Sequence, residues 1–132
     1  MRLTADTNIL VRVVVDDDPG QGRLARDALA TAEIVALTLP ALCEFVWVLT
    51  RAYRLSTDDV HEAVRRLVSA ENVAVDRAAA DAGLAILAAG GDFADGVIAH
   101  EGAWLGGDVF LSFDRKAVDL LQASGIAARL PA

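Results

Sequence analysis

The sequence has one cysteine, one lysine and no long uninterrupted apolar run. Its single cysteine, Cys43, excludes an internal disulfide and fits a reducing cytoplasm. The longest apolar stretch, residues 34–49, is broken by Thr38, Pro40 and Glu44 and is shorter than the roughly 18 residues that a membrane-spanning helix needs. The first residues lack the apolar core and cleavage site of a signal peptide. We therefore expect a cytoplasmic protein without a membrane segment.

Positive charge is scarce as well. Twelve Lys and Arg stand against 19 Asp and Glu, which gives a formal net charge of −7. This balance excludes a protein that holds nucleic acid through a broad basic face. Any nucleic-acid partner would have to be engaged locally, by individual arginines such as Arg12, Arg51, Arg54 or Arg115.

The hydrophobic content of 55% over 132 residues is enough for one domain, which we expect to span residues 1–132. Short apolar runs alternate with helical periodicity along the whole chain. This βα order predicts an α/β fold, a three-layer α/β/α sandwich with a central parallel sheet of about five short strands. After a first strand ending near Ala5, the predicted strands are 34–39, 72–75, 108–113 and 126–130, and the predicted helices are 8–15, 21–31, 41–52, 56–69, 76–89, 92–105 and 115–123.

Acidic residues stand where predicted strands end or helices begin. Asp6 and Asp114 each follow a strand, and Asp95 lies in the first turn of a helix that Asp92 opens. Ligands in open α/β sheets bind outside the carboxyl ends of the strands, so these positions are candidates for chemistry. Asp6, Asp92 and Asp114 are also suited to cap their helices by accepting hydrogen bonds from free amides, and for Asp92 we prefer this interpretation. Asp95 would then be an ordinary first-turn acid, which the helix dipole favours.

Glu44 is the one acid inside the apolar helix 41–52, which we expect to be largely buried. A carboxylate in such surroundings must be paired, protonated or bound to a cation. Two structural alternatives stay open: a salt bridge to Arg51 or Arg54, or a helix that turns Glu44 toward solvent.

The strand ends and helix starts of a parallel sheet lie on one rim, so the four acids can converge. Converged carboxylates repel one another unless a cation lies between them. The available ligands are oxygens, without a Cys/His cluster of zinc spacing, and such a set suits Mg²⁺ or Mn²⁺. Such an ion activates water and neutralises charge on a phosphate, so we expect metal-assisted hydrolysis of a phosphodiester.

These residues resemble the PIN-domain nucleases, particularly the VapC-like toxins of bacterial toxin–antitoxin pairs. The resemblance covers essentially the whole chain and consists of Asp-Thr-Asn at 6–8, a glutamate on the third helix at 44, Asp-Phe-Ala-Asp-Gly-Val-Ile-Ala at 92–99 and Leu-Ser-Phe-Asp at 111–114. The chain departs from the family at Gly96, where Ala is usual, and at Ser112, where Thr is common.

The resemblance implies an endoribonuclease that cuts RNA with Mg²⁺ or Mn²⁺ and leaves a 5′-phosphate and a 3′-hydroxyl. The metal-binding catalytic acids would be Asp6, Glu44, Asp95 and Asp114, with supporting contacts from Asp92, Thr7, Asn8 and Ser112. It further implies a homodimer and a cognate antitoxin whose tail carries basic residues into the acidic groove.

Two other interpretations remain open. A catalytically silent PIN-like module would bind partners only. A receiver-like signalling domain has a similar length and βα order, but Asp6 lacks an acidic neighbour, and Lys116, the only lysine, lies at the start of the last helix.

Overall fold

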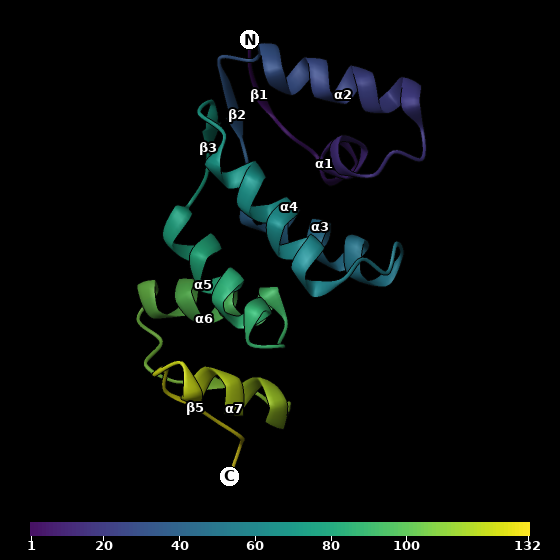
Figure 1. Ribbon diagram of the computed structural model, residues 1–132. Helices are drawn as coiled ribbons and strands as arrows, with labels where there is room; N and C mark the ends of the chain where they lie inside the picture. Colours follow the sequence, from purple (N-terminus) through teal and green to yellow (C-terminus); the bar gives the residue numbers. More distant parts are fainter. The chain divides into compact units, whose positions relative to one another are not determined.

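The computed structural model describes residues 1–132 and contains seven helices and five short strands (Figure 1). The chain divides into two units, residues 1–76 and 77–132, which are described in turn. All strands are parallel to their partners, as predicted, and belong to a three-stranded sheet in the first unit and a two-stranded sheet in the second.

The sheet of the first unit has the order β1-β2-β3. Its strands are β1 (Arg2–Thr4), β2 (Ile34–Ala36) and β3 (Val73–Ala74), shorter than the sequence predicts. Leu3 pairs with Val35, which in turn pairs with Val73. The fully covered Val35 lies at the centre of this apolar row, so the register is set by burial.

Four helices complete the first unit: α1 (Thr7–Val14), α2 (Pro19–Thr31), α3 (Leu39–Arg51) and α4 (Thr57–Ser69). The last three begin at polar caps, because Asp18, Thr38 and Ser56 each accept a hydrogen bond from a backbone amide three residues further on. Proline follows two of these caps inside the first turn, where its missing N–H costs no helical bond.

Helix α3 is amphipathic rather than buried all round, which corrects the prediction from its composition. One face carries Leu42, Phe45 and Leu49, all fully buried. On the other face Trp47 is 59% exposed, Glu44 is exposed, and Cys43 is partly exposed. Glu44 therefore meets water and needs no compensating partner, as in the solvent-facing alternative.

The second unit holds α5 (Arg77–Ala88), α6 (Phe93–Trp104), β4 (Phe110–Leu111), α7 (Arg115–Ala123) and β5 (Ala128–Arg129). Figure 1 shows α5 and α6 side by side, and their contact is the most extensive between any two elements. Two buried glycines, Gly83 on α5 and Gly96 on α6, allow this approach. A Cβ at Gly96 would lie 2.8 Å from the Cα of Gly83, so the helix backbones almost touch.

Helix α7 and the β4–β5 pair complete the second unit. Their small core consists of Ile86 from α5, Val118 and Leu121 from α7 and Ala128 from β5. The C-terminal α6 residue Trp104 is 81% exposed. None of the helices has the length and hydropathy that a membrane span requires.

Candidate functional site

Asp6 lies at the junction between β1 and α1, as the sequence predicts. Its Oδ1 accepts a hydrogen bond of 2.8 Å from the backbone N–H of Thr7, and its carbonyl accepts the first helical bonds from Ile9 and Leu10. Asp6 is therefore the N-cap of α1. The side chain is exposed and its second oxygen accepts no hydrogen bond, so that oxygen can still bind a ligand.

Glu44 and Asp6 line the same pocket in the first unit, which has a volume of about 320 Å³. Helix α1 supplies one wall and α3 the other, so residues far apart in the chain reach one space. The remaining lining residues are Thr7, Asn8, Val11, Arg12, Val48 and Tyr53. The pocket thus joins two of the predicted site acids and includes both predicted supporting residues of this unit, Thr7 and Asn8.

The three candidate acids of the second unit lie close together. Asp92 caps α6 by accepting from the N–H of Ala94 at 3.1 Å, and Asp114 caps α7 by accepting from Ala117 at 3.2 Å. The N–H of Asp114 donates to the Oγ of Ser112 at 3.0 Å, which gives Ser112 a role in shaping the turn before α7.

Asp95 differs from these caps because its carboxylate is partly buried and accepts no hydrogen bond within the unit. Burial raises the pKa of Asp95 above its usual value, and the negative charges of Asp92 and Asp114 raise this pKa further. A carboxylate with a raised pKa beside two others is an environment that a bound cation would relieve.

The donor set fits a hard cation. All candidate ligands are carboxylate oxygens, which Mg²⁺ and Mn²⁺ prefer. Within neither unit do three or more Asp, Glu, His or Cys side chains gather closely enough to hold an ion by themselves.

Sequence reasoning did not identify Val11, Val48 and Tyr53 as site residues. The two valines are indistinguishable in the sequence from other core residues of α1 and α3. Tyr53, the only tyrosine in the chain, lies just after α3. Its hydroxyl group on an apolar ring suits a binding site, and this signal could have identified it as a candidate site residue.

Comparison with known protein families identifies a match to the PIN domain over residues 4–121. This range runs from β1 into α7 and therefore includes all four candidate acids. The match confirms the resemblance to the PIN-domain family and the α/β PIN-like fold predicted from the sequence. Comparison with curated individual proteins finds no match.

Proposed function

Since the chain belongs to the PIN domain family, whose members are generally metal-dependent nucleases, we propose that it is an endoribonuclease that uses Mg²⁺ or Mn²⁺. The observation that carries this proposal is the family match, which extends across both units and includes the four acids that the resemblance implies as ligands. The match also favours this function over a receiver-like domain.

In this proposal Asp6, Glu44, Asp95 and Asp114 hold the ion jointly. When bound, the ion supplies an activated water and neutralises charge on the scissile phosphate. The capping bonds of Asp6 and Asp114 hold their carboxylates in place. Glu44, which is exposed and lines the pocket with Asp6, binds the ion or orients the attacking water. Thr7, Asn8, Asp92 and Ser112 support these acids.

We further infer the biological setting from the same resemblance. The protein would act in the cytoplasm as the toxin of a VapBC-type pair, as a homodimer with one nuclease domain over residues 1–132. Its cognate antitoxin would inhibit it by placing basic side chains against the acids. The acidic net charge of −7 supports a basic inhibitor.

An RNA cleavage assay tests the nuclease proposal. Purified protein is incubated with total RNA in Mg²⁺, in Mn²⁺ or in EDTA, and the ends of the products are sequenced. We expect cleavage in either metal, with 5′-phosphate ends, and none in EDTA. Asp6→Asn should abolish cleavage, whereas Asp16→Asn, an exposed acid in the turn after α1, should leave it intact.

A catalytically silent PIN-like module is the second candidate, favoured by the incomplete acid cluster in each unit taken alone. Calorimetric titration with Mn²⁺ separates the two. The enzyme should bind Mn²⁺ and lose that binding in Asp6→Asn and in Asp95→Asn. A protein that neither binds Mn²⁺ nor cuts RNA would refute the nuclease proposal.

A further inference from the structure

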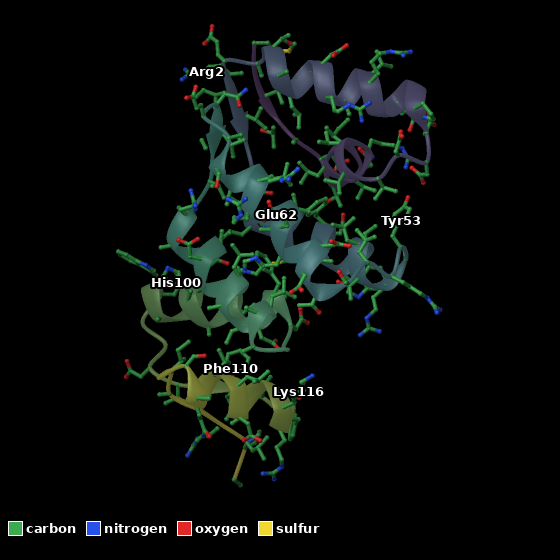
Figure 2. The ribbon with its side chains drawn as sticks, in the orientation of Figure 1. Arg2, Tyr53, Glu62, His100, Phe110 and Lys116 are labelled. Carbon is green, nitrogen blue, oxygen red and sulfur yellow. The ribbon has the colours of Figure 1, made fainter.

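One cation of the first unit is fixed beside the acids by a chain of hydrogen bonds. The Nε of Arg12 donates to Oε1 of Gln21 at 2.7 Å, and its Nη1 donates to Oδ1 of Asp17 at 2.9 Å. The other Asp17 oxygen accepts from the hydroxyl of Tyr53 at 2.8 Å. Figure 2 shows Tyr53 at the end of α3, so the network connects α1, the α1–α2 turn and the residues after α3.

Arg12 is the only positively charged residue among the eight that line the pocket of Asp6 and Glu44. The Arg12 side chain is 30% exposed, so solvent and ligands have access to it. The two carboxylates would repel a phosphate, and Arg12 offsets that repulsion on the same wall as Asp6. The pocket therefore has an anionic end and a cationic position, as a site for a phosphate ester beside a metal centre requires.

The network leaves donors unused. A guanidinium carries five N–H donors; Gln21 and Asp17 account for one each, and the hydroxyl of Tyr53 also forms a hydrogen bond with the Arg12 side chain. The remaining donors lie in the plane of the guanidinium, and a pair of them matches two oxygens of a phosphate. Because Gln21 and Asp17 hold Arg12 in one orientation, little further side-chain entropy is lost when a phosphate binds.

The rest of the pocket suits a base. Val11, Val48 and the ring of Tyr53 are apolar surfaces, and the amide of Asn8 can both donate and accept hydrogen bonds. Aromatic rings stack on unpaired bases regardless of their sequence. A volume of about 320 Å³ lies at the small end of ligand pockets, a size suited to one nucleotide.

We propose that this pocket binds one unpaired nucleotide of the RNA substrate next to the bond that is cut. Arg12 binds the phosphate of this nucleotide, and Tyr53 stacks on its base. Asp17 and Gln21 are positioning residues that hold Arg12. This proposal rests on the proposed nuclease function and adds to it the residues that bind the nucleotide beside the cleaved bond.

Binding of adenosine 5′-monophosphate in EDTA tests the pocket without any cleavage. Titration followed by ¹H–¹⁵N NMR should shift the signals of Asn8, Arg12 and Tyr53. Arg12→Gln should weaken binding about 10- to 100-fold, because a hydrogen-bonded ion pair is lost. Arg23→Gln, which removes the same charge from an exposed position on α2 outside the pocket, should leave the affinity unchanged. Equal effects of the two variants would overturn the proposal, as would equally tight binding of inorganic phosphate.

A second pair of variants tests the stacking and stays informative if Arg12→Gln fails to fold. Tyr53→Phe removes the hydroxyl, with its hydrogen bonds to Asp17 and Arg12, but keeps the ring, whereas Tyr53→Leu removes the ring as well. We expect Tyr53→Phe to bind within about threefold of the wild type. Tyr53→Leu should bind about 5- to 100-fold more weakly, as the loss of one stacked base predicts. Equal affinities of the two variants would overturn the role of the ring.

Cleavage kinetics distinguish a failure of the pocket from a failure of the nuclease proposal. On a single-stranded RNA oligonucleotide, Arg12→Gln should raise KM and leave kcat nearly unchanged, because the ion-binding acids are intact. If the wild type cuts RNA while these variants match Arg23→Gln, the pocket proposal is wrong and the nuclease proposal stands. If the wild type cuts no RNA, the nuclease proposal fails, and the nucleotide titration still decides whether the pocket binds.

Discussion

Replacing Gly96 by alanine should destabilise the protein although alanine is the better helix former. Gly96 lies in α6 where this helix meets α5. An added Cβ would stand 2.4 Å from the carbonyl oxygen of Ala82 and 2.8 Å from the Cα of Gly83. Both neighbours are backbone atoms that no side-chain rotation can move, so the two helices must separate.

The magnitude follows from two opposing effects. Overpacking a well-packed contact costs about 1–3 kcal/mol. Exchanging glycine for alanine inside a helix gains about 0.8–1.0 kcal/mol. We therefore expect Gly96→Ala to lower the free energy of unfolding by as much as about 2 kcal/mol.

Gly102→Ala is the matched control, because Gly102 lies on the same helix and a Cβ there meets nothing within 4 Å. Only the propensity gain remains, so this variant should be more stable than the wild type by about 0.5–1 kcal/mol. Urea denaturation followed by circular dichroism measures both variants. A Gly96→Ala protein as stable as Gly102→Ala would refute the close helix contact. This contact also gives a physical reason for glycine at a position where the resembling family usually has alanine.

Three further predictions concern the charged residues. Burial and two neighbouring acids raise the pKa of Asp95, so the stability that its neutral form confers is lost as the pH rises through that pKa. At pH 7 in EDTA, thermal unfolding of Asp95→Asn should therefore occur at a temperature no lower than that of the wild type. Hydrogen bonds from Arg65 and Arg66 lower the pKa of Glu62 to about 2. The stability contributed by ionised Glu62 is therefore present above about pH 4.5 and lost as the pH falls toward 2. In urea titrations, the free energies of unfolding of the wild type and Glu62→Gln should differ at pH 7 and converge near pH 2. Asp6→Asn keeps a capping oxygen and should retain stability, whereas Asp6→Ala should cost about 0.5–2 kcal/mol in thermal unfolding.

The order and type of the elements were predictable because local signals agree with the fold. Helix starts at Ser56 and Asp92 and the turn glycines at 90 and 125 follow directly from capping and backbone preferences. The strands were predicted too long, since an apolar run continues beyond the few residues that pair. The predicted strand 108–113, for example, pairs only at Phe110 and Leu111.

The environment of α3 was not predictable from its composition. Trp47 and Glu44 lie on one exposed face, whereas the opposite face with Leu42, Phe45 and Leu49 packs in the core. The sequence alone does not show which apolar side chains remain on the surface. The pocket depends on this detail. Glu44 lines the pocket with Asp6 because it lies on the exposed face, whereas the composition predicted a largely buried helix and left the solvent-facing orientation as an alternative.

Capping and metal binding do not compete as explanations for Asp6 and Asp114. A cap uses one carboxylate oxygen and fixes the side chain at the start of a helix, where the second oxygen can bind an ion. Their positions therefore support a metal centre without distinguishing it from an ordinary helix start. Glu44 and Asp95 are stronger evidence for a metal centre, because neither caps a helix. Glu44 lines a pocket together with Asp6, and the carboxylate of Asp95 is partly buried beside two other acids. Loss of metal binding in Glu44→Gln and Asp95→Asn is consequently the stronger test of the nuclease site.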